Sequence, residues 1–312
     1  MNLKIENHTF SLRDLKQAED GRFYGVASFF DGTNFTYYLV IFNNFIQDGV
    51  AIIRKYYKSS DLGFSGAFQN VAKAEGTGTY FFISADKLVK FEINILEGNK
   101  ISSSNIIVNP SIAQVLYDPQ LNILGNKLIY TRLIQDDNYG YEYMKAILNV
   151  EEEMPTNINL NSVNHISLNA NQFIDGARNN KFEAEIPYLT SNGKLVIRKI
   201  DLNGNQNTRI NFERTFSSNE NLYANITEDY VSVTNNSNIY LFYYDEKDKL
   251  AGLEEFYNGE FTGYMSNIHI LKQFNVKTII GVVDNGTNQT ICAVKNIYSP
   301  NTTSLPYYAL KF

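Results

Sequence analysis

Residues 20–44 read DGRFYGVASFFDGTNFTYYLVIFNN, and this stretch decides the fold. A run of eight residues rich in aromatic and β-branched side chains precedes the four-residue turn Asp-Gly-Thr-Asn, and a second run of eight follows it. Two such runs joined by a Gly/Asn/Asp turn are typical of a β-hairpin. The sequence therefore predicts a hairpin whose turn is centred near residue 32.

The same pattern recurs along the whole chain. Further copies have their turn centres near residues 85, 137, 192, 236 and 286. The intervals average about 51 residues, and strand-built periods of about 40 to 50 residues are typical of propeller blades rather than of sandwiches. The period predicts six copies of one structural unit.

Two further strands are expected in most copies, one before each hairpin and one after it. The expected inner strands are 10–17, 67–74, 112–118, 163–170, 221–227 and 267–274. The expected outer strands are 49–57, 105–109, 208–216, 250–258 and 306–312. The third copy lacks an outer strand because residues 150–161 are polar and interrupted by a proline. Residues 2–10 are expected to add an edge strand where a ring would close.

In this arrangement the chain resembles the β-propeller superfamily over its full length, at the level of architecture. The resemblance implies an all-β fold, a six-bladed β-propeller of four-stranded antiparallel blades in a single domain over residues 1–312. The expected blades cover roughly residues 10–60, 61–110, 111–162, 163–217, 218–260 and 261–312. The chain has no tryptophan and no Gly-Gly doublet, so it departs from the WD40 and kelch patterns and indicates no specific family.

Middle strands of a propeller contact neighbouring blades on both faces, so their side chains are expected to be buried. The residues expected in this core are Phe81, Ile83, Val196, Tyr240, Phe242, Ile280, Val282 and Cys292.

Charge and hydropathy exclude several functional classes. The net charge is −6 and basic residues are scattered, which disfavours nucleic acid as a partner. The one basic cluster, RKYYK at 54–58, is interpreted as a charged outer strand rather than as a stacking platform. No apolar run approaches the roughly 18 residues of a membrane span, and the first residues lack the apolar core of a secretion signal. A cytoplasmic or particle-associated location is therefore expected.

Candidate catalytic and metal-binding residues all have a structural interpretation. Glu183 and Glu185 lie two apart on a strand and could act as paired acids, but the same alternation predicts a solvated face opposite buried residues. His165 and His269 fall in inner strands of non-adjacent copies and His8 precedes the first, so a shared metal is not expected. The sequence favours a protein without catalytic residues, metal or cofactor.

The function favoured by the sequence is a non-enzymatic interaction or structural module that binds a protein partner through a loop face, as in a phage or injection-type assembly. The expected contact residues lie in two aromatic loops and are Tyr139, Tyr141, Tyr143, Tyr257, Phe261 and Tyr264. The alternative is a carbohydrate-binding or carbohydrate-active propeller, a glycosidase or lyase, with a glycan as its partner. The absence of tryptophan, the usual sugar-stacking residue, counts against this alternative.

Overall fold

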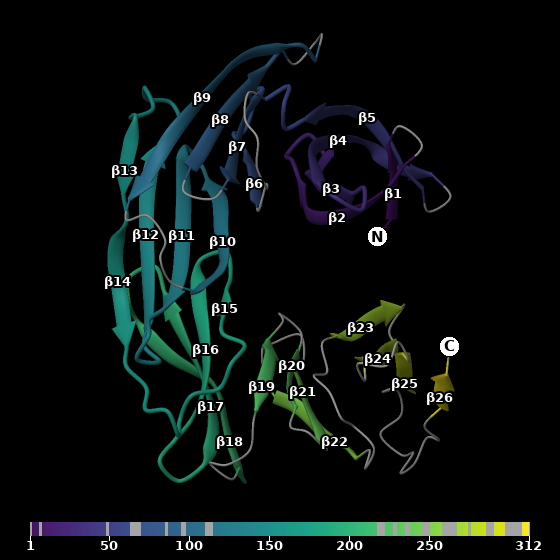
Figure 1. Ribbon diagram of the computed structural model, residues 1–312, viewed down its shortest axis with the longest axis vertical. Helices are drawn as coiled ribbons and strands as arrows, with labels where there is room; N and C mark the ends of the chain where they lie inside the picture. Colours follow the sequence, from purple (N-terminus) through teal and green to yellow (C-terminus); the bar gives the residue numbers. More distant parts are fainter. Residues whose placement is uncertain are drawn as a thin grey trace. The chain divides into compact units, whose positions relative to one another are not determined.

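The protein is all-β in the computed structural model (Figure 1). The backbone is described for residues 2–5, 8–47, 50–62, 70–84, 87–94, 98–109, 115–216, 222–226, 230–234, 238–244, 250–257, 267–273, 276–284, 290–296 and 308–311. Strands in these segments form six sheets, here numbered in chain order.

The first and second sheets have five strands each. The first has the order β1-β2-β3-β4-β5, with β1 (Asn2–Ile5), β2 (His8–Gln17), β3 (Phe23–Phe30), β4 (Phe35–Gln47) and β5 (Val50–Lys58). The second has the order β13-β9-β8-β7-β6, with β6 (Asn70–Lys73), β7 (Thr79–Ser84), β8 (Lys87–Ile93), β9 (Lys100–Asn109) and β13 (Asn157–Asn159).

The third and fourth sheets have four strands each. The third has the order β10-β11-β12-β14, with β10 (Val115–Leu124), β11 (Lys127–Gln135), β12 (Tyr141–Asn149) and β14 (Asn161–Ile166). The fourth has the order β15-β16-β17-β18, with β15 (Arg178–Asn179), β16 (Glu183–Leu189), β17 (Lys194–Asp201) and β18 (Gln206–Thr215).

The fifth and sixth sheets repeat the four-stranded order. The fifth consists of β19 (Tyr223–Ile226), β20 (Tyr230–Thr234), β21 (Asn238–Tyr244) and β22 (Leu250–Tyr257). The sixth consists of β23 (Asn267–Gln273), β24 (Val276–Asp284), β25 (Thr290–Asn296) and β26 (Tyr308–Lys311).

Each of the six predicted hairpins forms two adjacent interior strands of a sheet. In the first, Tyr24 pairs with Ile41 and Phe30 with Phe35 on either side of the Asp-Gly-Thr-Asn turn. Asp31 Oδ1 accepts hydrogen bonds from the backbone N–H groups of Thr33 (2.8 Å) and Asn34 (2.7 Å), which closes this turn. Turn chemistry and strand propensity agree here, which explains why the hairpins are predictable from sequence.

The predicted inner strand at 163–170 is wrong. Only residues 163–166 lie in a strand, and that strand is β14, which pairs with β12 as the last strand of the third sheet, with Glu142 opposite His165. The first strand of the fourth sheet is instead the two-residue β15, whose Asn179 amide donates to the Thr131 carbonyl over 3.1 Å. A short polar segment carries too little hydrophobic alternation to indicate which hairpin it joins.

β1 and β13 are additional edge strands, one on each of the two five-stranded sheets. β1 pairs with β2, so the N-terminal segment does form an edge strand, on the first sheet. β13 runs parallel to β9 along the edge of the second sheet before the chain continues to β14 beside β12 (Figure 1). The polar composition of residues 150–161 gave no indication of β13.

The contacts divide the chain into two compact units. The first comprises Met1–Ser167, Arg178–Ala184 and Ile200–Gln206, and the second comprises Leu168–Ala177, Glu185–Lys199 and Asn207–Phe312.

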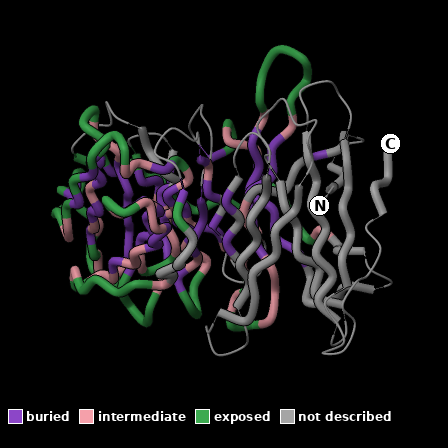
Figure 2. The backbone as a smooth tube through the Cα atoms, turned by 90° about the horizontal axis from the view of Figure 1, so that it is seen from below, coloured by how far each residue is buried: buried purple, intermediate pink, exposed green. Residues whose placement is uncertain are grey.

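In the first unit, the second sheet is buried on both faces. Tyr80 and Phe82 pack in a cluster with Val26 and Leu39 of the first sheet. Phe81 belongs to a separate cluster with residues of the third sheet. Because successive side chains of a strand point to opposite faces, burial of both faces requires a continuous apolar run. Figure 2 shows buried stretches within strands and exposed stretches in the connecting turns.

The second unit has its own core. Leu195 and Ile197 of β17 pack in one cluster with Ala224 of β19 and with Val231 and Val233 of β20. The predicted burial of Phe81, Ile83 and Val196 is confirmed. Tyr240, Phe242, Ile280, Val282 and Cys292 lie outside the side chains that the structure describes.

Candidate functional site

A groove of about 350 Å³ opens between the first and second sheets, within the first unit. β5 and the β2–β3 turn form one wall, and the β6–β7 and β8–β9 turns form the other. The lining residues are Glu19, Asp20, Arg22, Ile41, Arg54, Lys55, Tyr57, Lys73, Gly76, Thr77, Gly78, Tyr80, Ile93 and Gly98.

A β-bulge places two cations side by side in this groove. Lys55 pairs with Ile41, whereas Ile53 pairs with Phe42, so Arg54 is an extra residue in β5. A bulge re-aims the side chain next to it, and both Arg54 and Lys55 line the groove although a regular strand would point them to opposite faces. Both side chains are exposed. Lys55 Nζ lies 5.8 Å from the centre of the Tyr57 ring, a cation–π contact that helps to position it.

The β2–β3 turn carries the acidic side of the groove. The Arg22 backbone N–H donates to Asp20 Oδ1 over 3.0 Å, and Arg22 Nε lies 3.5 Å from Asp20 Oδ2. Gly21 has a φ of 78°, which an L side chain rarely adopts. Asp20 therefore largely neutralises Arg22, whereas neither Arg54 nor Lys55 on β5 forms an ion pair among the described residues.

The opposite wall is built from closely packed backbone. A Cβ atom on Gly78 would lie 2.0 Å from the Ile93 carbonyl oxygen, so only glycine allows this approach. The Tyr57 hydroxyl donates to the Gly98 carbonyl and joins the two walls at the base of the groove.

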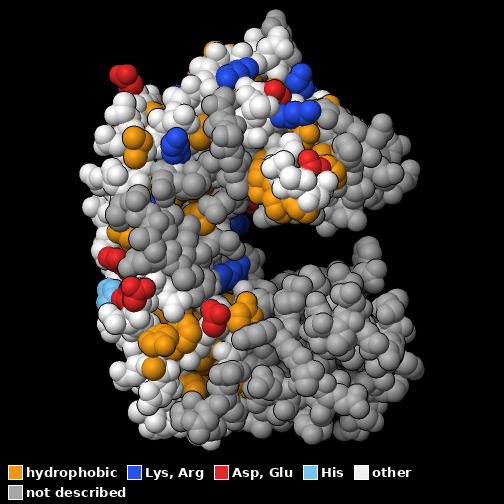
Figure 3. All heavy atoms as spheres, in the orientation of Figure 1, with side chains coloured by type: hydrophobic (Ala, Val, Ile, Leu, Met, Phe, Trp, Pro, Cys, Tyr) orange, Lys and Arg blue, Asp and Glu red, His pale blue; other side chains and the backbone are white. Residues whose placement is uncertain are grey.

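The groove carries more basic side chains than acidic ones, four against two. Burial lowers the pKa of Lys73, and the nearby Asp20 carboxylate opposes that shift. Burial raises the pKa of both Tyr57 and Tyr80, so their phenols stay protonated near neutral pH. Hydrogen bonding to Glu19 raises the pKa of Glu75 beside the rim. Figure 3 shows Lys and Arg side chains, with an acidic one among them, gathered over β5 and the adjoining end of the second sheet.

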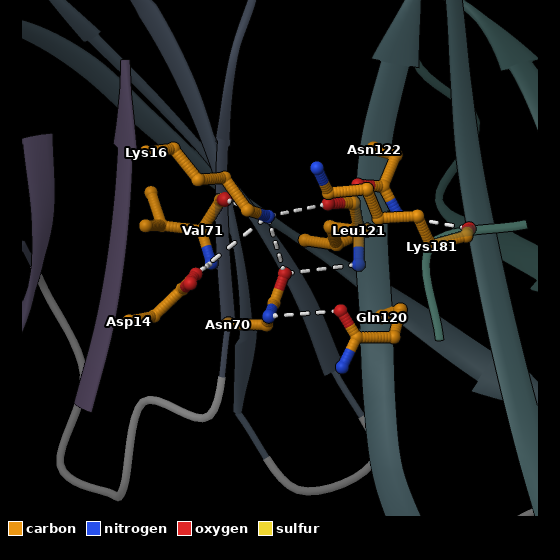
Figure 4. A network of polar contacts seen from close by, with 8 residues as sticks. All are labelled: Asp14, Lys16, Asn70, Val71, Gln120, Leu121, Asn122 and Lys181. Carbon is orange, nitrogen blue, oxygen red and sulfur yellow. Dashed lines mark hydrogen bonds and ion pairs between the residues drawn. The ribbon is translucent and has the colours of Figure 1, made fainter. Parts of the chain in front are cut away.

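A second polar cluster joins β2, β6 and β10, one strand from each of the first three sheets (Figure 4). Lys16 Nζ on β2 donates to Asn70 Oδ1 (2.8 Å), the Val71 carbonyl (2.6 Å) and the Leu121 carbonyl (2.7 Å). Asp14 Oδ2 lies 3.6 Å from the same amine and accepts the Val71 N–H over 3.0 Å. Asn70 Oδ1 also accepts the Leu121 N–H over 3.0 Å.

This cluster is structural rather than catalytic. An ammonium group has three donors, and all three donors of Lys16 are used. Burial lowers the pKa of Lys16, with the Asp14 carboxylate opposing the shift. A nucleophilic lysine needs a free amine facing a cavity, whereas this amine connects β2, β6 and β10.

The predicted tyrosine-rich binding tip is only partly exposed. Tyr139 lies in the β11–β12 turn with a φ of 59° and a 42% exposed side chain. Tyr141 and Tyr143 are fully buried in β12, a middle strand with β11 and β14 on its two sides, so their expected exposure at a tip is wrong. Tyr257 ends β22, and its side chain, like Phe261 and Tyr264, lies outside what the structure describes.

The solvated face predicted for the paired acids is wrong at Glu185. Its side chain is 1% exposed, and Glu185 Oε1 accepts a hydrogen bond from Arg209 Nη1 over 2.5 Å in the second unit. Ala184 and Ile186, its neighbours on the other face, are also buried. β16 is thus buried on both faces at this point, which period-two alternation alone does not reveal.

Histidines and metal ligands give no site in the described part of the chain. His165 Nε2 lies 3.1 Å from Asp136 Oδ2 in an exposed pair, and the side chains of His8 and His269 are not described. Among the described residues, no three His, Cys, Asp or Glu side chains are grouped as a metal site would require. Nor do these residues form a helix with the length and apolarity needed to cross a bilayer.

The groove was not predicted as a site, although the sequence contained a signal for it. The cluster RKYYK at 54–58 was read as a charged edge strand, and β5 is indeed the edge of the first sheet. The β-bulge and the facing turns of the second sheet, which make it a binding surface, depend on tertiary structure.

No protein-family model and no curated protein matches the sequence. A structure of the fission yeast SREBP–SCAP binding domains in complex matches with a TM-score of 0.50 at 9% identity, over 98% of this chain and 86% of that chain. The WD40 domain of SCAP from fission yeast matches with a TM-score of 0.47 at 11% identity, over 97% of this chain and 70% of that chain. The Dos1 propeller gives 0.45 at 12% identity, over 94% and 72%. In its fold the chain is similar to these structures, which include WD40 and propeller domains. At such low identity the likeness concerns the fold, and no specific family follows from it.

Proposed function

We propose that this protein is a non-enzymatic interaction module that binds a protein partner through the groove between its first and second sheets. The observation that carries the proposal is the pair of exposed cations, Arg54 and Lys55, held by a bulge against the Tyr57 ring. Interfaces favour such residues because Arg and Tyr combine apolar contact area with directional hydrogen bonds. Tyr139, exposed on the β11–β12 turn, is a second proposed contact.

The groove is better suited to binding than to catalysis. Its lining, all within the described residues, contains no histidine and no cysteine, and Asp20 is engaged by Arg22. Catalysis requires a nucleophile or base oriented by a partner group and facing a reacting atom. Recognition needs only complementary charge and shape.

We further propose that residues 1–312 form one domain in which each sheet is a blade, giving a six-bladed propeller. The face-to-face packing of the second sheet against the first and third supports this arrangement, as does the recurrence of the four-stranded unit. The fission yeast SREBP–SCAP structure is a complex of binding domains, which is consistent with a partner-binding role on a similar fold. A component of a phage or injection-type assembly, cytoplasmic or particle-associated, fits such a role.

Site-specific cross-linking tests the function directly. A photo-reactive amino acid replaces Thr77, which is exposed on the β6–β7 turn and lines the groove. The control position is Ile147, 48% exposed on β12. We expect one protein from the native source to be cross-linked at position 77 and not at 147. Equal patterns at both positions, or none at either, would contradict the proposal.

A carbohydrate ligand is the second candidate, and one feature of the second unit favours it. A pocket of about 330 Å³ is lined largely by neutral amides and hydroxyls, among them Asn169, Asn171, Gln172, Thr190 and Asn192. Amide side chains both donate and accept, as sugar hydroxyls require. Specific glycan binding that is lost in Asn171→Ala, without loss of stability, would favour this candidate.

A further inference from the structure

We infer that the occupant of the groove is an acidic segment of the partner protein, whose carboxylates pair with Arg54 and Lys55. This inference rests on the proposed function and specifies the chemistry of the partner.

The two cations of β5 in the groove are not neutralised by neighbouring carboxylates in the described part of the chain. Among the described residues, neither Arg54 nor Lys55 forms an ion pair, whereas Arg22 lies 3.5 Å from Asp20. Adjacent cations repel each other, so a carboxylate bound between them relieves that repulsion as well as gaining two charge-assisted hydrogen bonds. A protein with a net charge of −6 that keeps two unneutralised cations together on one wall is arranged to receive an anion there.

Lys73 on the opposite wall provides a further amine for an anion bound in the groove. Lys73 is half-buried, and its amine makes one long hydrogen bond, 3.4 Å, to the Ala74 carbonyl. A carboxylate entering from β5 would provide this amine with a stronger acceptor. The Tyr57 hydroxyl is already engaged by Gly98, so the aromatic floor offers ring surface rather than a further donor.

The acidic side chains in the groove distinguish an acidic peptide from a polynucleotide. Glu19 and Asp20 line the same groove within the first unit, and a continuous polyanion would have to pass these carboxylates. A peptide instead presents backbone N–H groups between its acidic side chains, and Glu19 can accept them. The mixed rim therefore favours a ligand that alternates acceptors with N–H donors over a continuous polyanion.

The test uses fluorescence anisotropy of the full chain with a labelled peptide of alternating Glu and Gly. The matched probe replaces Glu by Gln, and a single-stranded oligothymidine tests nucleic acid. The groove variant carries Arg54→Glu and Lys55→Glu. Its control carries Lys87→Glu and Lys127→Glu, which change the net charge equally at exposed lysines outside the groove. Circular dichroism and the melting temperature check folding, and the milder pair Arg54→Gln and Lys55→Gln replaces the groove variant if that variant is unfolded.

We expect the Glu peptide to bind the unmodified protein, and its affinity to fall as the salt concentration rises. The affinity should be about tenfold lower for the groove variant and less than about twofold lower for the control. Equal affinity for the Gln peptide, an unaffected groove variant or tighter binding of the oligonucleotide would overturn the inference. The cross-linking experiment separates the two proposals. If the groove variant still cross-links the partner at position 77 with the yield of the unmodified protein, the protein-binding function stands and the acidic-segment inference fails. If the unmodified protein cross-links nothing, the proposed function fails first.

Discussion

Replacing Lys16 by Met should destabilise the protein strongly, because it removes the donor that connects β2, β6 and β10. Three oxygens within 2.8 Å lose the ammonium group, two of them backbone carbonyls. Met keeps most of the aliphatic volume, so a cavity contributes little. An acceptor left without its donor in a buried site costs about 1 to 3 kcal/mol. Relief of the buried charge offsets part of this cost, and we expect a net loss of about 3 kcal/mol.

A double-mutant cycle with Asn70 makes the test specific. Asn70 Oδ1 accepts from both Lys16 and the Leu121 N–H, so Asn70→Leu should also destabilise. The two losses should be non-additive by about 1 kcal/mol, because each substitution removes the same hydrogen bond. Lys127→Met, at an exposed position of β11, is the control and should change stability by less than about 0.5 kcal/mol.

Urea unfolding followed by circular dichroism and tyrosine fluorescence measures these free energies, and coincident transitions establish that they are comparable. A loss below about 1 kcal/mol for Lys16→Met, or strict additivity with Asn70→Leu, would refute the connection of the three strands through this amine.

Three further predictions concern other parts of the fold. Gly78→Ala should reduce the free energy of unfolding by about 2 to 3 kcal/mol, because its Cβ would lie 2.0 Å from the Ile93 carbonyl oxygen; an unchanged urea midpoint would contradict this packing. Glu185→Gln should cost about 3 kcal/mol by leaving the Arg209 charge buried beside a neutral amide, and adding Arg209→Met should restore part of that loss in the same assay. Burial raises the pKa of Tyr24 from 10.0 to about 12, so its contribution to stability, roughly 3 kcal/mol, is complete below pH 10 and is lost as the pH rises to about 12. The loss of stability between pH 10 and about 12 should be absent in Tyr24→Phe. If the stability of Tyr24→Phe has the same pH dependence as that of the unmodified protein, the phenol is not buried.

The sequence by itself determined the repeated hairpin. Gly, Asn and Asp at the turns and β-branched or aromatic residues beside them act over a few residues, so the local pattern was sufficient to predict β3 with β4 and the other middle pairs. The regular period then indicated a propeller, because a unit that recurs over the whole chain must pack against copies of itself.

Local pattern was insufficient where a strand is short and polar. β14, with the sequence NSVNHI, has no apolar face that distinguishes the edge of the third sheet from the start of the fourth. Contacts with β12 decide its place, and sequence neighbours carry no information on those contacts.

Tertiary structure alone decided which polar side chains are buried and where a surface can bind. Alternation along a strand separates two faces, but in stacked sheets both faces of a middle strand are covered, so the side chains of Tyr141, Tyr143 and Glu185 are buried although each carries a polar group. The groove likewise depends on an extra residue in β5 and on turns of the next sheet some 20 to 45 residues away in the chain. Burial and site geometry arise from packing between segments distant in sequence, whereas turns and strands arise from the chemistry of adjacent residues.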